Sequence, residues 1–239
     1  MEQNATLTKD KKGAINVSTF SQKIHSYLKH PFSLLVWIIT ILAALLTAAS
    51  FGYLVLYILI KGVPYLRPEL FSWTYDSNNV SMLPSIINTF LLTALSLVIS
   101  VPLGIFAAIY MVEYAKKGNR IVKFIRVTAE TLSGIPSIVY GLFGMIFFVG
   151  VLKMQLSLLS GSLTVAIMVL PTIMRTTEEA LLSVPQSYRE GSFGLGAGKL
   201  RTVFRIVLPS AVPGILSGVI LATGRIVGET AALIYTAGT

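Results

Sequence analysis

Five long apolar runs, separated by short polar segments, dominate the pattern of the chain. Each run approaches or exceeds the roughly 20 apolar residues that a helix needs to cross a bilayer, and none alternates with a period of two as membrane strands do. Backbone polar groups in lipid must be satisfied internally, so runs of this kind favour helices. The pattern therefore predicts an all-α, polytopic membrane helical bundle. Its expected spans are residues 34–60, 84–112, 131–152, 157–175 and 206–236.

The basic residues predict which side of the membrane each polar segment faces. Segments between successive spans alternate sides, and fifteen of the nineteen Lys and Arg residues then fall on one side and three on the other, with Arg225 inside a span. Cytoplasmic loops carry the excess of Lys and Arg in membrane proteins. We therefore expect a cytoplasmic N-terminal tail over 1–30 and a transmembrane domain over 31–239. The cytoplasmic loops are expected at 113–126 and 176–205.

Composition supports a membrane protein and excludes several other classes. Hydrophobic residues make up 54% of the 239 residues and charged residues 12%, about half the charged share of a soluble domain. The mean hydropathy is +0.76. The absence of cysteine excludes a disulfide scaffold. In a soluble protein, a net charge of +9 would suggest binding to nucleic acid. Here the charged residues lie beside apolar spans, so we expect the chain to contact a lipid bilayer and not nucleic acid.

The residue inventory offers no enzyme site. The two histidines lie in the polar tail, and no cysteine supports them as metal ligands. Gly198 and Lys199 resemble the end of a nucleotide-binding P-loop, but Phe193 stands where the first glycine is required and Leu200 where a hydroxyl is required. We therefore expect no catalytic site, no metal and no cofactor in this chain.

The segment 176–205 carries a motif that an ordinary basic loop would lack. It is mixed in polarity, too long for a minimal turn and on the expected cytoplasmic side, which suits contact with a soluble partner. Its pattern is E-x(5)-G-x(9)-I-x-L-P. The residues concerned are Glu190, Gly196, Ile206, Leu208 and Pro209, with the small residues Gly191 and Ser192 directly after the glutamate.

This segment resembles the EAA loop of ABC-importer permeases, in which a short helix, a glycine turn and a second helix dock onto an ATPase subunit. Gly191 and Ser192 stand in place of that family's two alanines and are also small. The resemblance implies that the seven motif residues couple the chain to an ATPase. We expect Gly196 to need a backbone angle that other residues rarely adopt. The alternative is an ordinary basic loop beside the membrane.

The resemblance extends over residues 80–239, where three segments are similar to the phosphate-specific importer's permease of the PstA type. These segments are SGIPSIVYGLFG at 133–144, LPTIMRTTEEALLSVPQSYREGSFGLGA at 170–197 and GRIVGETAALIYTAG at 224–238. The family, type I ABC-importer permeases, has six helices. The resemblance thus implies five spans here and a sixth missing at the C-terminus.

The resemblance also implies a function and partners. The chain would form the alternating-access path of an ATP-driven phosphate importer in the bacterial inner membrane, while a separate subunit hydrolyses ATP. Its expected partners are a cytoplasmic ATPase dimer, a PstC-like sister permease and an extracytoplasmic phosphate-binding protein. Three alternatives stay open: a permease for molybdate or sulfate, a non-transporting sensor or scaffold subunit, and a channel gated by a partner.

Two arginines and a glutamate are the candidate substrate path. Arg225 and Glu229 lie one helical turn apart in the last span, so they are expected to share a face and to pair. Arg175 ends span four. Charges within a span are costly and usually face a path or the bundle interior, and a guanidinium fork matches phosphate oxygens. The alternatives are a pair that only fixes helix packing and, for Arg175, an arginine at the membrane interface.

Smaller features predict local structure. The spacings Gly214 to Gly218 and Gly224 to Gly228 are suited to a close approach of helices. Glu130 is expected at the start of span three, where a carboxylate favours a helix N-terminus. Prolines inside the apolar runs predict kinks or helix ends.

Overall fold

Every described element of the chain is helical. The residues described by the computed structural model are 31–73, 81–116 and 118–238, and no β-strand occurs within them. The chain divides into two compact units, residues 1–68 and 69–239. The all-α class predicted from the apolar runs is confirmed, whereas the predicted tail over 1–30 lies outside the described residues.

The first unit consists, in its described part, of helix α2 (Pro31–Gly62) and the 3-10 turn η1 (Val63–Tyr65). No residue of α2 is buried. Large apolar side chains are exposed along its whole length, as in helices that lipid or other membrane helices surround. The predicted span at 34–60 is confirmed, and α2 is slightly longer at both ends.

The second unit is a bundle around one buried helix, α6 (Leu158–Ser183), in which 14 of 26 residues are buried. It packs against α3 (Leu83–Ile109) and α9 (Leu208–Val227). α3 follows the short turn η2 (Pro68–Phe71) and ends in a π-helical turn, η3 (Tyr110–Tyr114). The predicted spans at 84–112 and 157–175 are thus present as α3 with η3 and as α6.

Glycine residues bring α9 against α6. A Cβ atom on Gly214 would lie 2.7 Å from the Cβ of Ala180, and one on Gly218 would lie 2.0 Å from the hydroxyl oxygen of Thr176. Neither position can accept a side chain, so the close approach predicted for this glycine pair is confirmed. Around Gly224, in the second predicted pair, no atom of another described segment lies within 4 Å of such a Cβ, so no described helix approaches closely there.

Two apolar clusters fill the bundle along α6. One lies towards the end of α6 that leads to α7 and contains, among others, Ile109, Met174, Leu181, Val207 and Ile215. The other lies along the first part of α6 and contains, among others, Leu92, Tyr140, Met168, Ile173 and Ala222. Buried hydroxyls add hydrogen bonds between helices, as when Ser96 donates to the carbonyl of Ser162 at 3.1 Å. Packing and hydrogen bonds of this kind are what hold helices together in lipid.

A sharp break divides the third predicted span, 131–152. α4 (Arg120–Ser133) is followed by α5 (Ser137–Gly144), which continues into the π-helical turn η4 (Met145–Val151), and the two segments are bent by 104°. Pro136 explains the break, because proline lacks an N–H and disfavours the helical conformation in the residue before it. Glu130 therefore lies near the end of α4, and its expected position at a helix start is wrong.

The last predicted span, 206–236, is also broken. α9 ends at Val227, and α10 (Ala231–Thr236) follows after a short turn. The carbonyl oxygen of Thr236 accepts hydrogen bonds from the Ser160 hydroxyl at 2.6 Å and from the Ser157 N–H at 3.1 Å. These bonds tie α10 to the beginning of α6. α10 also packs against α5.

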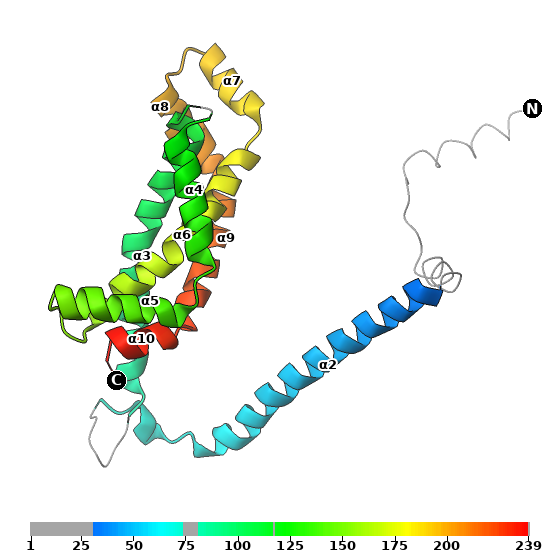
Figure 1. Ribbon diagram of the computed structural model, residues 1–239, viewed down its shortest axis with the longest axis vertical. Helices are drawn as coiled ribbons and strands as arrows, with labels where there is room; N and C mark the ends of the chain where they lie inside the picture. The colour runs from blue at the N-terminus through cyan, green and yellow to red at the C-terminus, as the bar shows by residue number, and fades with distance from the viewer. Residues whose placement is uncertain (1–30, 74–80, 117, 239) are drawn as a thin grey trace, which may run out of the picture. The chain divides into compact units, whose positions relative to one another are not determined.

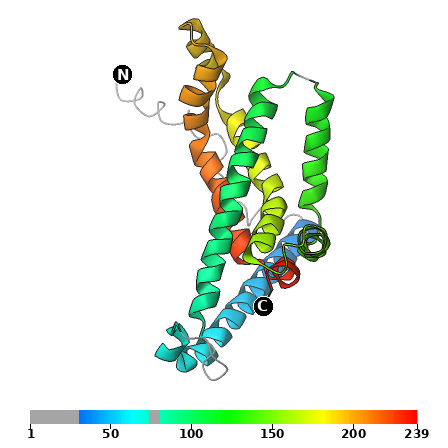
Figure 2. The ribbon, with the colours of Figure 1, turned by 90° about the vertical axis from the view of Figure 1, so that its left-hand side faces the viewer.

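The predicted cytoplasmic loop at 176–205 is largely helical. Its first part completes α6, and the rest forms α7 (Gln186–Gly194) and α8 (Lys199–Thr202). α8 continues through the π-helical turn η5 (Val203–Val207) into α9. Figure 1 shows α7 and α8 at one end of the bundle and α5 with α10 crossing it near the other. Figure 2 shows the same separation after a turn of 90°.

Length and composition allow up to five membrane spans among the described residues. Four helical segments are long and apolar enough by themselves, and the bent pair of α4 with α5 and η4 gives a fifth if the pair crosses as one span. The chain is thus a multi-pass membrane protein, and the segment of its third predicted span is bent rather than straight.

The basic residues at the α7 end predict that this end faces the cytoplasm. The chain has no cysteine, so single cysteines can be introduced at exposed leucines, Leu195→Cys at the α7 end and Leu152→Cys near the other end. An impermeant maleimide added to intact cells should label Leu152→Cys. It should label Leu195→Cys only after permeabilisation, and labelling of Leu195→Cys in intact cells would contradict this topology.

Candidate functional site

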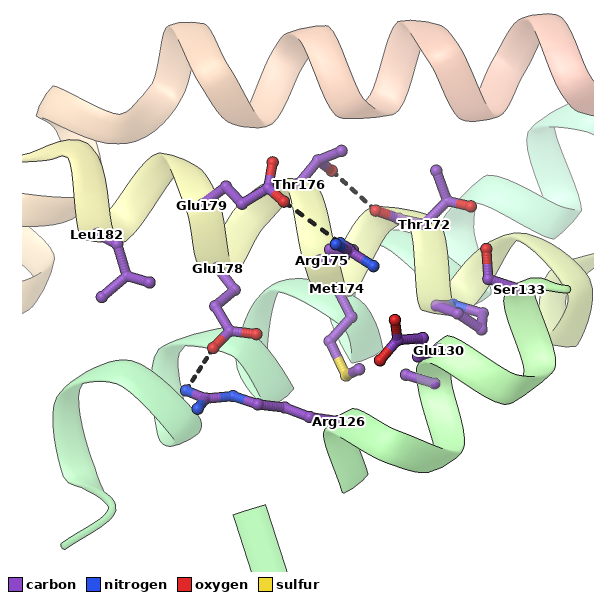
Figure 3. Close-up of a pocket in the computed structure, with 12 residues that line it drawn as sticks. Arg126, Glu130, Ser133, Thr172, Met174, Arg175, Thr176, Glu178, Glu179 and Leu182 are labelled. Atoms are coloured by element: carbon purple, nitrogen blue, oxygen red, sulfur yellow. Dashed lines mark hydrogen bonds and ion pairs between the residues drawn. The ribbon is translucent and has the colours of Figure 1, made fainter. Parts of the chain in front are cut away.

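A cavity of about 520 Å³ lies between α4 and α6, in the half of α6 that leads to α7. Figure 3 shows the lining residues, which come from the second half of α4 and from residues 171–182 of α6. The charged residues among the twelve are Arg126, Glu130, Arg175, Glu178 and Glu179. Arg175, a residue of the predicted substrate path, therefore lines a cavity to which both α4 and α6 contribute charged side chains.

Each arginine of the cavity is held by a glutamate. Nη2 of Arg126 lies 2.5 Å from Oε1 of Glu178 and so joins α4 to α6. Nε of Arg175 donates to Oε1 of Glu179 at 3.3 Å, one turn along α6. Both side chains of this second pair are about two-thirds exposed, and exposed pairs at this spacing stabilise a helix by only about 0.3–0.5 kcal/mol. A competing anion can therefore displace Glu179 from Arg175 at little cost.

Arg225 and Glu229 do not form the predicted ion pair. Arg225 lies in the last turn of α9, but the helix ends at Val227 and Glu229 follows the break at Gly228. The carboxylate of Glu229 accepts a hydrogen bond from the N–H of Ala232 at 3.0 Å and thus satisfies a free N–H at the start of α10. The expected pairing failed because it requires a continuous helix across both positions.

The helix, turn and second helix predicted from the motif are present in α7 and α8. Gly196, in the turn, has φ of +80°, in the left-handed region that favours glycine. No atom lies within 4 Å of a Cβ built there, so the backbone angle alone requires glycine, as predicted. The hydroxyls of Ser192 and Thr202 are buried and 2.8 Å apart, which closes α7 onto α8.

The motif residues divide between an exposed face and a packed one. Those exposed are Glu190, Gly191, Gly196 and Pro209, and those partly or fully buried are Ser192, Ile206 and Leu208. Beside the exposed residues, 91% of Leu195 and 66% of Leu200 are accessible. Large apolar side chains that are this exposed on α7, α8 and the turn between them are available for a contact with another protein. A groove of about 500 Å³ at this tip includes Arg201 and Arg205.

A buried ion pair, absent from the sequence analysis, ties α7 to the bundle. The guanidinium of Arg189 donates to Oε1 of Glu113, in η3, through Nη2 at 2.7 Å and Nε at 3.0 Å. It also donates to the carbonyls of Leu181 at 2.9 Å and Val184 at 2.8 Å, at the end of α6 where helix carbonyls lack partners. The side chains of Arg189 and Glu113 are only 11% and 8% exposed. Removing one partner of such a pair costs about 3–5 kcal/mol.

Comparison with known proteins identifies the family. Residues 100–239 match the family described as "Binding-protein-dependent transport system inner membrane component". The chain belongs to this family. Among relatives of this permease is a probable ABC transporter permease protein, YqgI, of Bacillus subtilis, 37% identical over 201 residues that cover 82% of this chain and 67% of that protein.

Other relatives carry more specific names. The phosphate transport system permease protein PstA of Mycobacterium leprae is 41% identical over 144 residues, which cover 59% of this permease and 46% of that protein. The PstA of Haemophilus influenzae is 34% identical over 179 residues, covering 74% of this permease and 63% of that protein. The match thus spans about half of the length of the mycobacterial relative.

The fold of the permease has a counterpart among solved structures. A chain of the MetNI methionine ABC transporter, in an inward-facing conformation, matches with a TM-score of 0.53 at 22% identity, over 64% of this permease and 72% of that chain. Likeness at this identity concerns the fold alone. It confirms the helical ABC-permease fold expected from the sequence.

The sequence of the permease indicated Arg175 and the motif at 190–209 as candidates, but it did not indicate two ion pairs between elements. Glu113 and Arg189 are 76 residues apart, and Arg126 and Glu178 belong to helices whose boundaries were not foreseen. One signal was available for the first pair. Glu113 is the first charged residue after the uncharged run 77–112, and basic residues follow it. An acidic side chain at the end of a membrane span needs a partner for its charge.

The positive φ of Gly196 leads to a test with a matched control. Gly196→Val places a β-branched side chain in the left-handed region at a cost of about 1–2 kcal/mol, which should raise the opened fraction of the turn about 5- to 30-fold. Gly194→Val adds the same side chain at a helical position with equally open surroundings. Trypsin should cleave after Lys199 several-fold faster in purified Gly196→Val than in Gly194→Val. Equal cleavage rates would refute the role given to the φ angle.

Proposed function

We propose that this chain is the membrane-spanning permease subunit of an ATP-driven phosphate importer. The observation that carries the proposal is Arg175 in the cavity between α4 and α6, held only by an exposed glutamate. A guanidinium presents a fork of donors that matches phosphate oxygens and stays ionised. Relatives named as phosphate transport permeases support phosphate over other tetrahedral anions.

The proposed path contains two arginines at different depths. Helices α9 and α6 are antiparallel, since Gly214 lies against Ala180 and Gly218 lies against Thr176. If this register continues, Arg225 lies at the level of Val169, roughly 9 Å further from the α7 end than Arg175 at 1.5 Å per residue. Arg225 would then meet the anion first, and Arg175 would meet it nearer the cytoplasm.

The carboxylates beside these arginines favour brief passage of an anion over tight binding of it. Three glutamates and two arginines line the cavity, so a phosphate dianion is repelled unless it takes the place of a glutamate. Glu179 can yield Arg175 readily because their pair is exposed. Glu229, whose carboxylate binds the start of α10, would hold that helix near Arg225 while the anion passes. Affinity for phosphate would then reside in the external binding protein.

Import of phosphate requires an energy source. A divalent anion that enters an inside-negative cell climbs about 4.6 kcal/mol per 100 mV, twice the single-charge value. The binding-protein-dependent family implies an ATPase, a second permease and an external binding protein as partners. In this proposal the partners are a cytoplasmic ATPase dimer, a PstC-like sister and a phosphate-binding protein at the bacterial inner membrane. The N-terminal tail would be cytoplasmic.

The exposed tip of α7 and the following turn is the proposed ATPase contact. Glu190 and Gly191 are exposed there beside Leu195, and the packed residues Ile206 and Leu208 connect the tip to α9. Closure of the ATPases would push α7 and rock the helices, so that the arginines are exposed first outward and then inward.

Replacing Arg225 tests the path. Arg225→Gln keeps most of the side-chain length but loses the charge and the fork, so ATP-dependent phosphate uptake by proteoliposomes of the full complex should fall roughly tenfold to a hundredfold. Arg225→Lys should keep part of the uptake because the charge remains. Arg120→Gln, which removes an exposed arginine at the start of α4, serves as the control and should transport at the wild-type rate.

The same assay separates the competing functions. Wild-type uptake by assembled Arg225→Gln would eliminate Arg225 as a substrate contact. Flux through the wild-type complex that persists with a hydrolysis-deficient ATPase would indicate a channel, and absence of any flux would indicate a sensor or scaffold. Preference for sulfate or molybdate over phosphate in a competition series would indicate a permease for another oxyanion.

A further inference from the structure

The buried ion pair of Arg189 and Glu113 joins the exposed helix α7 to α3 through η3. We propose that this pair is the link that passes a displacement of α7 to α3, and that it therefore determines how much ATP hydrolysis is converted into transport. The inference rests on the proposed function of α7 as the ATPase contact. It goes beyond that function by assigning two positioning residues that touch neither ATPase nor substrate.

The geometry of Arg189 makes α7 and η3 move as one body. Two donors of its guanidinium converge on a single oxygen of Glu113, and two further bonds reach carbonyls at the end of α6. A sliding motion of α7 would break bonds to two elements at once. Since both charges are nearly enclosed, separating them would leave an uncompensated buried charge. Motion is therefore transmitted through the pair rather than absorbed by it.

The element that receives this motion leads directly to the path. η3 continues α3, and α3 is packed tightly on α6, because a Cβ on Gly104 would lie 2.8 Å from Cγ2 of Ile173. α6 in turn lines the cavity that contains Arg175. A shift of η3 thus reaches the cavity through closely packed helices, which have no free space to take it up.

The second half of the coupling segment reaches the same turn. Nζ of Lys199, at the start of α8, lies 5.1 Å from the ring centroid of Tyr114, in η3. η3 is a π-helical turn, and such turns inside helices are frequent at functional sites. Contacts from both α7 and α8 converge on η3, but only the one from Arg189 is buried.

The test requires a variant that removes the link without leaving a buried charge. Arg189→Met combined with Glu113→Leu removes both charges and keeps apolar bulk. In the reconstituted complex this double variant should still co-purify with the ATPase and hydrolyse ATP, while the ATP hydrolysed per phosphate imported rises roughly tenfold, within the usual range of coupling between sites. A ratio equal to that of the wild type would show that the pair only packs the fold and would overturn the inference.

A second variant keeps the test decisive if the double variant fails to assemble. Glu113→Gln leaves the charge of Arg189 unpaired but keeps an oxygen acceptor for it and its bonds to α6, so it should cost less than deletion of either side chain. It should therefore assemble and show a smaller rise in the same ratio. An unchanged ratio in assembled Glu113→Gln would then overturn the inference. Arg120→Gln again serves as the control for loss of a charge. Failure of the wild-type complex to import phosphate would refute the proposed function, whereas import with unchanged ratios in the variants refutes only the link.

Discussion

The packing of α6 against its neighbours determines where each functional side chain of the bundle lies. Lipid gives helices no hydrophobic reason to associate, so close approach and interhelical hydrogen bonds must hold them. Gly104 of α3 and Gly218 of α9 both meet side chains of α6 at distances that no Cβ would permit. One side of α6 is left to the cavity with Arg175, and its last carbonyls bind Arg189 of α7. The cavity and helix α7 are thus both positioned by the same central element.

Three arginines of the bundle differ in how firmly their surroundings hold the guanidinium. Arg189 is nearly enclosed, with four hydrogen bonds that commit its donors to Glu113 and to α6. Arg175 is mostly exposed and has one weak partner on its own helix, which leaves its fork available to an anion. Arg126 is half exposed and spans the cavity to Glu178. The ease with which each guanidinium can leave its carboxylate therefore differs, and the pair of Arg189 and Glu113 resists separation most.

Features set by local chemistry were predictable from the sequence. Apolar runs of sufficient length predicted helices, because lipid leaves the backbone few alternatives. The resemblance of the motif to an EAA loop implied a helix, a turn and a second helix, and the special angle of Gly196 followed from the conformational freedom of glycine. The family resemblance is confirmed by the match over residues 100–239.

Features that depend on breaks or on distant partners were not predictable in the same way. Apolar residues lie on both sides of the breaks at Pro136 and Gly228, so the pattern predicts single spans for the third and fifth runs. The expected pairing of Arg225 with Glu229 fails for that reason, since a helix that ends between them removes their shared face. Ion pairs between remote segments require the packed bundle. The roles of Arg225, Glu229 and Arg175 in a substrate path stay predictions.

The central claim is that ATP controls the cavity between α4 and α6 as an anion path. Its most direct test is the distance between spin labels on Val127→Cys of α4 and Leu182→Cys of α6, two exposed positions in a chain without other cysteines. In the assembled complex, ATP should shift the distance distribution from one population to a second, and a hydrolysis-deficient ATPase should hold it in the second. An identical distribution without nucleotide, with ATP and after hydrolysis would contradict the account.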